Sequence, residues 1–320
     1  MTRYFAFNGD ADGLCALQQL RLAEPGDATL VTGVKRDIQL VRRVDAVRGD
    51  SVTVLDVSLE QNRDDVLRLL EAGASVRYFD HHRAGDMPQH RGLDAHIDEA
   101  PDVCTSAIVD RCLEGRYRAW AAVAAFGDGL SSVGATLARK AGLAAASVTL
   151  LEELGTRLNY NAYGEAVTDL HFDPQALAQQ MLPFADPLDF IRESDVHASL
   201  GACYDDDMRR ARALKPLHET PGATVMVLPS EAWARRTIGV LANELSRGRP
   251  DSAIAILSPK SGGGFTVSVR VPAKRAVDAG AFCSTFASGG GRATAGGINH
   301  LPESEVERFA AHFTQRFAIP

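Results

Sequence analysis

The sequence predicts an α/β protein in which a parallel, doubly wound sheet domain is followed by a smaller mixed α/β C-terminal domain. Short apolar runs alternate with amphipathic runs over the first 100 residues, and a strand-like pattern returns near residue 223. The chain has 320 residues, which exceeds the length at which one hydrophobic core usually stops growing. Strand–helix alternation is typical of parallel sheets that carry helices on both faces.

The elements of the first domain follow one another in a regular order. Apolar residues that alternate along the chain indicate strands, and those that recur every three or four residues indicate helices. The predicted strands are Tyr4–Phe7, Ala28–Val34, Ser51–Val57, Ser75–Phe79 and Ala95–Ile97. The predicted helices are Leu14–Ala23, Ile38–Arg48, Arg63–Ala72 and Thr105–Leu113.

A helical region and a charged connection come next. Residues 118–204 are helical in pattern with Gly and Pro breaks, and the charged stretch Tyr204–Leu214 is the predicted connection. We therefore expect a first domain of residues 1–205 and a second of residues 206–320. The second domain has three predicted strands and two predicted helices: Thr224–Leu228, Ala253–Leu257 and Phe265–Val271, with Ala232–Ser246 and Glu303–Phe317.

The composition is that of an ordinary globular protein. Hydrophobic residues make up 45% and charged residues 23%, which excludes a largely disordered chain. No signal-peptide pattern opens the sequence, and no apolar run reaches the roughly 18 residues that a membrane span needs. The five cysteines are scattered without a Cys-x-x-Cys motif, as expected for reduced thiols. We expect a cytoplasmic protein that does not bind membranes.

Charge is unevenly distributed along the chain. The net charge is −7, but residues 201–320 contain 15 basic and 11 acidic residues, whereas residues 1–200 contain 19 basic and 30 acidic residues. An acidic half suits cation binding and a basic half suits an anionic substrate, although such an asymmetry also arises by chance. The overall negative charge argues against extended binding of duplex DNA, which needs many phosphate-neutralising side chains.

Acidic and imidazole side chains occur where predicted strands end. Asp10 and Asp12 follow the first strand, Asp56 lies near the end of the third, and Asp80-His81-His82 follows the fourth. Each motif alone is common in turns, helix caps or on surfaces. Together they are informative, because open parallel sheets bind ligands beyond the carboxyl ends of their strands. Carboxylates gathered there repel one another unless a cation neutralises them.

The residue types indicate which metal such a site would hold. Carboxylate oxygens with one or two imidazoles, and no suitably placed thiolate, favour Mn²⁺ or Mg²⁺ over zinc. Two carboxylates in an Asp-x-Asp motif can serve two different ions, and Asp56 can bridge them. Paired ions about 3.5–4 Å apart are a common device for cleaving phosphate esters. We expect two Mn²⁺ ions, with Mg²⁺ as the alternative.

The motifs resemble those of the DHH phosphoesterases, and the resemblance covers nearly the whole chain. Asn8–Gly13 is similar to the first motif as it occurs in RecJ-type exonucleases, Leu55-Asp56 to the second, and Asp80-His81-His82 to the motif that names the family. Cys104–Ala107 resembles the helix start that follows, and Gly127-Asp128-Gly129 the fourth motif. Two C-terminal segments resemble the DHH-associated domain: Ser268–Arg270 and Gly289–Gly297.

The resemblance implies roles for individual residues. Asp12, Asp56, His81 and Asp128 would bind one manganese ion, and Asp10 and Asp56 would help to bind the other. The implied catalytic pair is His82, which would face the substrate phosphate or assist proton transfer, and Asp80, which would orient a neighbouring histidine. The resemblance also implies that the active site lies in the cleft between the domains. The C-terminal domain would bind the substrate's phosphates through Arg270, Gly289, Gly290, Gly291 and Arg292.

Two positions depart from the family pattern. Ala6 stands where the family usually has a histidine ligand, and Asn8 offers only a neutral amide oxygen nearby, so occupation of the first metal site stays open. Arg292 follows the glycine run where the family typically has histidine. An arginine cannot act as a base, but it can bind phosphate through two parallel hydrogen bonds.

These observations predict a manganese-dependent phosphoesterase that hydrolyses small nucleotides or short single-stranded oligonucleotides. A nucleotide-binding protein of the same fold with degraded catalysis is the first alternative, prompted by Ala6 and Arg292. An inorganic pyrophosphatase is the second alternative. A dinucleotide redox protein is excluded, because no Gly-x-Gly-x-x-Gly follows the first strand. A homodimer is compatible with the sequence.

Overall fold

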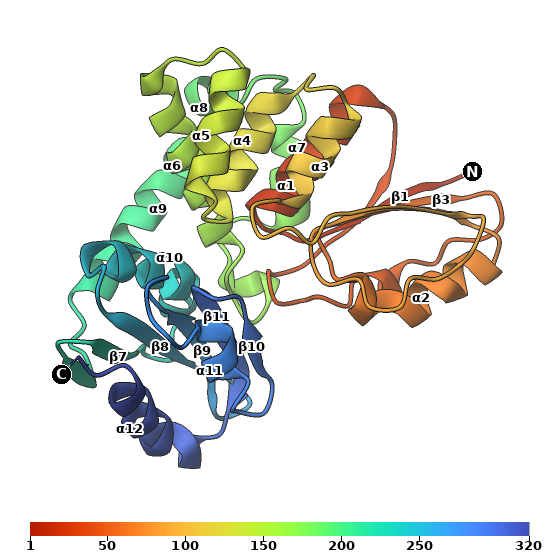
Figure 1. Cartoon of the computed structure of the whole chain (residues 1–320). Helices are drawn as coiled ribbons and strands as arrows, with labels where there is room; N and C mark the ends of the chain where they lie inside the picture. The colour runs from red at the N-terminus through yellow and green to blue at the C-terminus, as the bar shows by residue number, and fades with distance from the viewer. Residues whose placement is uncertain (320) are drawn as a thin grey trace. The chain divides into compact units, whose positions relative to one another are not determined.

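The computed structural model describes residues 1–319, and the chain divides into two compact units, Met1–Ala202 and Cys203–Pro320. Each unit contains its own β-sheet (Figure 1). The five-stranded sheet of the first unit is entirely parallel, and the six-stranded sheet of the second is mixed. The predicted α/β fold class is therefore confirmed.

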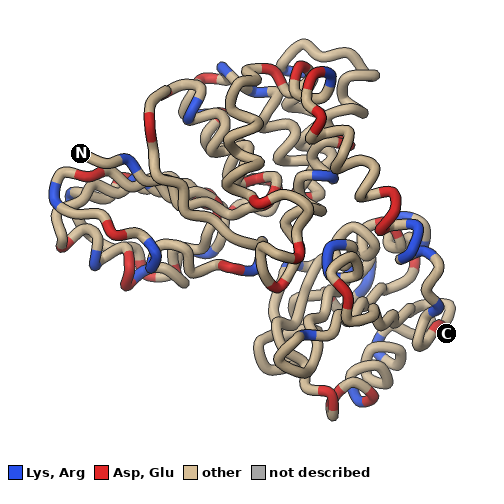
Figure 2. The backbone as a smooth tube through the Cα atoms, turned by 180° about the vertical axis from the view of Figure 1, so that it is seen from behind, with Lys and Arg blue, Asp and Glu red and all other residues tan. Residues whose placement is uncertain are grey.

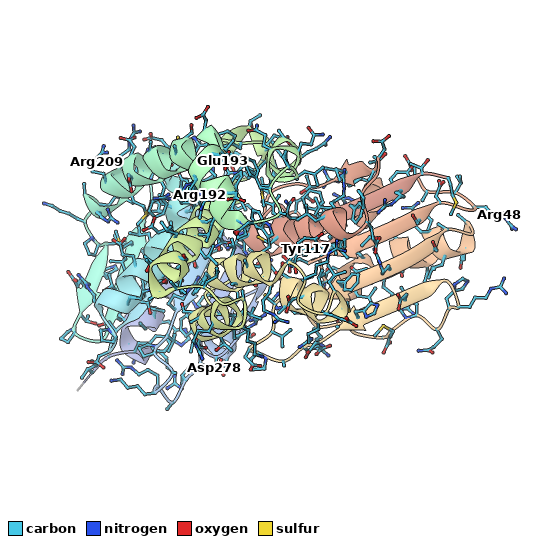
Figure 3. All side chains as sticks on the ribbon, turned by 90° about the horizontal axis from the view of Figure 1, so that it is seen from above. Arg48, Tyr117, Arg192, Glu193, Arg209 and Asp278 are labelled. Carbon is cyan, nitrogen blue, oxygen red and sulfur yellow. The ribbon has the colours of Figure 1, made fainter. Side chains whose placement is uncertain are left out.

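The sheet of the first unit has the order β2-β1-β3-β4-β5. Its register pairs Phe7 with Leu55 and Leu55 with Phe79, so the carboxyl ends of three adjacent strands lie level. The amino ends lie at the opposite edge, near Arg48 in Figure 3, which shortly precedes β3. The strand bounds are Arg3–Phe7 for β1, Thr29–Val31 for β2, Ser51–Leu55 for β3, Ser75–Asp80 for β4 and Leu93–Ile97 for β5.

The two faces of this sheet bury different side chains, because successive residues of a strand point to opposite faces. Phe5 and Phe7 of β1 pack into the core that contains α1 (Ala11–Ala23). Ala6 packs into the opposite core, which contains α2 (Leu59–Glu71). Figure 1 shows α1 and α2 on opposite sides of the sheet. Helices thus cover both faces, as a doubly wound sheet requires.

A group of helices completes the first unit after β5. Tyr117, labelled in Figure 3, donates a 3.0 Å hydrogen bond from its hydroxyl to the carbonyl of Leu22 at the end of α1. The helices are α3 (Thr105–Cys112), α4 (Arg118–Gly127), α5 (Ser131–Lys140), α6 (Ala145–Asn161), α7 (Pro174–Met181) and α8 (Pro187–Glu193). Within residues 1–319 no helix has the length and apolarity that crossing a membrane demands.

Helix α9 (Asp195–Arg212) runs through the boundary between the two units. Figure 2 shows an acidic stretch along this helix followed by a basic one. These are Asp205–Asp207 and then Arg209, Arg210 and Arg212. Basic residues at a helix C-terminus interact favourably with the helix dipole, so the charged sequence predicted to connect the domains forms a regular helix.

The sheet of the second unit has the order β10-β11-β9-β8-β7-β6. Only β7 and β8 are parallel, and α10 (Ala232–Gly248) connects them. Phe282 packs against Phe309, Phe313 and Phe317 in the core on one face. The remaining bounds are β6 His218–Thr220, β7 Ala223–Val227, β8 Ala253–Pro259, β9 Phe265–Arg270, α11 Ala279–Cys283, β10 Gly289–Gly291, β11 Ala295–Leu301 and α12 Val306–Arg316.

One sequence prediction was wrong. The helix expected at Ile38–Arg48 is an irregular segment with one short 3₁₀ turn, Val41–Arg43. Its backbone is held instead by Asn62 of α2, whose side chain binds the N–H of Val41 and the carbonyl of Ile38. The glycine run Gly289–Gly291 forms the edge strand β10, which pairs with β11.

Candidate metal centre

Four carboxylates and one imidazole meet at the carboxyl edge of the parallel sheet. Asp10 follows β1, Asp56 follows β3, and His81 follows β4. Asp12 lies in the first turn of α1, and Asp128 directly follows α4. All except Asp128 are nearly inaccessible to solvent. We call Asp10, Asp12, Asp56 and Asp128 the carboxylate cluster.

Asp10 is the N-cap of α1. Its Oδ1 atom accepts hydrogen bonds from the N–H of Asp12 at 3.0 Å and the N–H of Gly13 at 3.1 Å. The first N–H groups of a helix have no partner within the helix, and an aspartate in this position satisfies them. The cap holds the Asp10 carboxylate at the edge of the sheet.

Asp12 lies against the N-terminus of a different helix, α3. Its two carboxylate oxygens accept hydrogen bonds from the N–H groups of Thr105 and Ser106, each at 2.7 Å. The Ser106 hydroxyl donates to the Asp12 carbonyl at 2.9 Å. Helix N-termini favour anions, so α3 stabilises a buried carboxylate that has no charged partner in its own helix.

Asp56 has a backbone φ of 58°, in the left-handed region that non-glycine residues seldom adopt. Its N–H still donates to the carbonyl of Phe79 at 3.1 Å, so the ladder of β3 and β4 continues to this residue. The Thr105 hydroxyl donates to Asp56 Oδ1 at 3.1 Å. Strained backbone often occurs at functional sites, and here it turns the carboxylate toward the cluster.

His81 is oriented by a carbonyl group. Its Nδ1 atom lies 2.7 Å from the oxygen of Val103, which requires a proton on Nδ1. The Nε2 atom then faces the carboxylates, at 3.4 Å from Asp56 Oδ1 and 3.6 Å from Asp128 Oδ2. A histidine that binds a metal usually donates its other ring N–H in this way.

The ligand atoms are close enough to hold a cation. One oxygen of Asp12, one of Asp128 and a ring nitrogen of His81 lie within 4.8 Å of one another. Asp56, His81 and His82 form a second group that meets the same limit. This set of oxygen and imidazole donors fits Mn²⁺ or Mg²⁺.

Asp80 and His82 form a pair beside the cluster. His82 Nδ1 lies 2.7 Å from Asp80 Oδ1, and the His82 side chain is 43% exposed. Asp80 is fully buried, and its Oδ2 atom has no hydrogen-bond partner among the described residues. The pair therefore holds the His82 ring through its Nδ1 atom and leaves the side chain partly exposed.

Lys35 is the residue that sequence reasoning missed. Its ammonium contacts Asp10 Oδ2 and lies 3.6 Å from Asp128 Oδ1. Lys35 follows β2, which pairs with β1, so it reaches the same edge of the sheet as the carboxylates. A basic residue after a strand was the available signal, but the sequence alone does not reveal that β2 neighbours β1.

Asn8, the weaker ligand candidate, is already engaged by the backbone. Its side-chain oxygen accepts from the N–H of Asp10 at 3.3 Å, and its amide nitrogen donates to the carbonyl of Lys35 at 3.2 Å. The Asn8 side chain thus fixes the loops around the site, and both ends of its amide are used.

Burial and nearby charges together shift the pKa values of Asp56, Asp10 and His81. Burial raises the pKa of Asp56 well above its ordinary value, and the charges of Asp10 and Asp12 raise it further. Burial also acts to raise the pKa of Asp10, but the Lys35 ammonium outweighs it and the pKa is lowered. Burial disfavours a charged His81, yet the hydrogen bond to Asp56 and the nearby carboxylates raise its pKa to about 10. A divalent cation would relieve the same repulsion.

The residues expected to bind phosphate lie in the second unit. Arg270 Nε donates to Asn243 Oδ1 at 2.8 Å, and its Nη1 donates to the Val269 carbonyl at 2.9 Å. Arg292 is exposed, in the turn between β10 and β11. Arg236 of α10 is buried, with its Nε 2.8 Å from Asp207 Oδ2.

The three glycines of β10 differ in what their surroundings allow. A Cβ on Gly289 would lie 1.9 Å from the carbonyl oxygen of Cys283, and one on Gly291 would lie 2.4 Å from Gly296 Cα. A Cβ on Gly290 would meet nothing within 4 Å. Packing against α11 and β11 therefore accounts for two of the glycines, whereas the space that a side chain of residue 290 would fill is open.

Comparison with solved structures places this geometry in a known fold. A manganese-bound RecJ exonuclease superimposes with a TM-score of 0.63 and 17% identity, covering 100% of this chain and 91% of that one. RecJ of Thermus thermophilus, also in complex with Mn²⁺, gives 0.59 and 16%, covering 98% of this chain and 51% of that one.

The pGpG-specific phosphodiesterase PggH of Vibrio cholerae gives a TM-score of 0.52 and 14% identity, covering 98% of both chains. No protein-family model and no curated protein sequence matches the chain. The chain has the DHH phosphoesterase fold. Residues of all the expected motifs of the DHH domain meet at one edge of its sheet, whereas those of the C-terminal domain lie in the second unit.

Proposed function

We propose that this protein is a metal-dependent phosphoesterase. The observation that carries the proposal is the group formed by Asp12, His81 and Asp128, whose ligand atoms lie within 4.8 Å of one another at the carboxyl edge of a DHH fold. Manganese is the proposed metal, because oxygen and imidazole donors without thiolates suit it. Two of the solved structures with this fold carry manganese.

The protein residues divide the work of such a reaction. Bound divalent cations lower the pKa of water and neutralise charge on a phosphoryl group. Asp12, Asp56, His81 and Asp128 would hold the metal, with His81 kept in the required orientation by Val103. His82, fixed by Asp80 and partly exposed, is positioned to bind a phosphate oxygen or to give a proton to the leaving oxygen.

We propose small nucleotides or short single-stranded oligonucleotides as substrates. The net charge of −7 disfavours a long duplex. The similar structures include an exonuclease and a phosphodiesterase specific for the dinucleotide pGpG, and the latter matches this chain over nearly its full length. Arg270, Arg292 and the backbone at Gly290 are the proposed phosphate-binding groups of the second unit.

Hydrolysis of a panel of labelled compounds tests the proposal. The panel comprises linear dinucleotides, pentanucleotides, pAp, a cyclic dinucleotide, pyrophosphate and a nitrophenyl phosphodiester, each with Mn²⁺ and with EDTA. We expect release that requires Mn²⁺ and falls at least about 10²-fold in Asp128→Asn. Asp64→Asn, the same change at an exposed residue of α2, serves as the matched control. Equal activity in EDTA or in Asp128→Asn contradicts the proposal.

A nucleotide-binding protein without turnover is the second candidate. It is favoured by Ala6 in place of the family histidine and by the contact of Lys35 with Asp10, which leaves that carboxylate outside both groups of potential metal ligands within residues 1–319. Saturable binding of a nucleotide from the same panel, with Mn²⁺ bound and no product formed, would establish this candidate.

A further inference from the structure

We propose that the Lys35 ammonium permanently takes the place of one of the two metal ions, so that this protein binds a single divalent cation. The proposal rests on the proposed metal-dependent function and makes it more specific. It is carried by the surroundings of Asp10, Lys35 and Ala6.

Both oxygens of Asp10 have protein partners. Oδ1 accepts the N–H groups of Asp12 and Gly13, and Oδ2 contacts the Lys35 ammonium. Among residues 1–319, the groups with metal-ligand spacing are Asp12 with His81 and Asp128, and Asp56 with His81 and His82. Neither includes Asp10. The Asp10 carboxylate, which was expected to hold a second ion, is thus neutralised by the side chain of Lys35.

Lys35 is held in this position at both ends of the residue. Its ammonium donates to Asn159 Oδ1 at 3.1 Å and lies 5.8 Å from the centre of the Tyr163 ring. Its backbone N–H donates to the carbonyl of Ala162 at 2.9 Å, and its carbonyl accepts from Asn8. The Lys35 side chain is only 25% exposed. Such a constrained ammonium differs from a surface lysine that contacts an acid by chance.

The surroundings of Ala6 and Asn8 also disfavour an ion beside Asp10. Ala6 is fully buried in the core on the α2 face of the sheet, so no ligand is supplied from that position. The Asn8 side-chain oxygen is bonded to the N–H of Asp10. Neither residue adds a ligand, so an ion beside Asp10 would depend on the carboxylates of Asp10 and Asp56, and the Lys35 ammonium occupies the first of these.

The ammonium retains part of what a metal ion would do. It reduces the repulsion between Asp10 and Asp128. Its nitrogen contacts Asp10 and lies 3.6 Å from Asp128 Oδ1. Asp10 and Asn159 accept two of its three N–H groups, and the third can bind a phosphate oxygen. It does not lower the pKa of a water molecule as a metal does, so that task falls to the one ion beside Asp12, His81 and Asp128.

Metal stoichiometry tests the proposal independently of turnover. Full-length protein is stripped with EDTA, dialysed to equilibrium against Mn²⁺, and analysed for manganese per chain and by electron paramagnetic resonance. We expect one ion per chain, with the spectrum of isolated Mn²⁺. Lys35→Ala is expected to bind two, with the spectrum of an exchange-coupled pair, because ions in such sites are about 3.5–4 Å apart.

Three variants complete the design. Lys35→Arg keeps the cation and is expected to bind one ion, as is Lys140→Ala, a change at an exposed lysine of α5. Asp128→Asn is expected to lose the single ion. Two ions in the wild-type protein, or one in Lys35→Ala, overturn the role of Lys35 and leave the phosphoesterase proposal standing. No bound ion in the wild-type protein overturns both.

Discussion

The Nδ1 atom of His81 lies 2.7 Å from the carbonyl oxygen of Val103, and this contact determines which ring nitrogen faces the carboxylate cluster. Val103 is in the loop before α3, and the same segment supplies the N–H groups that bind Asp12. One short stretch of chain therefore orients two of the proposed ligands. Several expected outcomes depend on how these ligands are held.

Manganese binding should release protons. In the metal-free protein His81 has a pKa of about 10, so it is charged at neutral pH and must lose a proton to bind a metal. The apparent affinity for Mn²⁺ should therefore rise with pH, by up to about tenfold per pH unit, until the pH approaches that pKa. Calorimetry at pH 7 in two buffers of different ionisation enthalpy counts the protons. A count near zero contradicts this assignment.

The same pKa gives the metal-free fold a pH dependence. Because the pKa of His81 is raised from its ordinary 6.5 to about 10, its contribution to stability is complete below pH 6.5 and is lost as the pH rises from 6.5 through about 10. Chemical denaturation in EDTA between pH 6 and 10 measures this loss. If the stability of His81→Gln falls with pH as steeply as that of the wild type, the pH dependence comes from other groups.

Lys35 should be important for stability when no metal is present. Lys35→Ala leaves Asp10 buried and without its cation, and breaking a buried ion pair from one side costs about 3–5 kcal/mol. Denaturation in EDTA measures the change, and we expect Lys35→Arg to lose less. Mn²⁺ should restore part of the stability of Lys35→Ala. A variant as stable as the wild type in EDTA would show that Asp10 does not need this partner.

Asp12 and Asp128 should differ in their effect on folding. Each change to asparagine removes one carboxylate from the cluster, but only Asp12 accepts the N–H groups of Thr105 and Ser106. An asparagine there presents its NH₂ group to one of these donors. We expect Asp12→Asn to be less stable than Asp128→Asn by about 1.5–3 kcal/mol, the range for hydrogen bonds to a charged group. If the two variants have equal melting curves in EDTA, the proposed role of Asp12 at the N-terminus of α3 is contradicted.

The glycines of β10 should separate packing from substrate binding. Gly289→Ala brings a Cβ to 1.9 Å from the Cys283 carbonyl oxygen, whereas Gly290→Ala meets nothing within 4 Å. We expect Gly289→Ala to lose about 1–3 kcal/mol of stability through overpacking. Gly290→Ala should keep the wild-type melting temperature and raise KM, if its backbone binds phosphate as proposed. An unchanged KM would remove Gly290 from the proposed site.

Much of the fold was predictable because its signals are local. The alternation of β1 and the apolar stripe of α2 indicated strand and helix, and their order indicated a parallel sheet. The failure at Ile38–Arg48 has a tertiary cause. Its residues have a helical pattern, but Asn62 of α2 binds the backbone at Ile38 and Val41 and holds the segment in an irregular path.

By itself, the sequence determined that Asp10, Asp56 and His81 would lie at one edge of a sheet, since each follows a parallel strand and parallel strands end on the same side. Only the tertiary structure decided their partners. Asp12 is bound by an N–H group 93 residues away, and Lys35 reaches Asp10 because β2 lies next to β1. Strand order and helix docking depend on contacts between distant segments, and the local periodicity of the sequence does not predict such contacts.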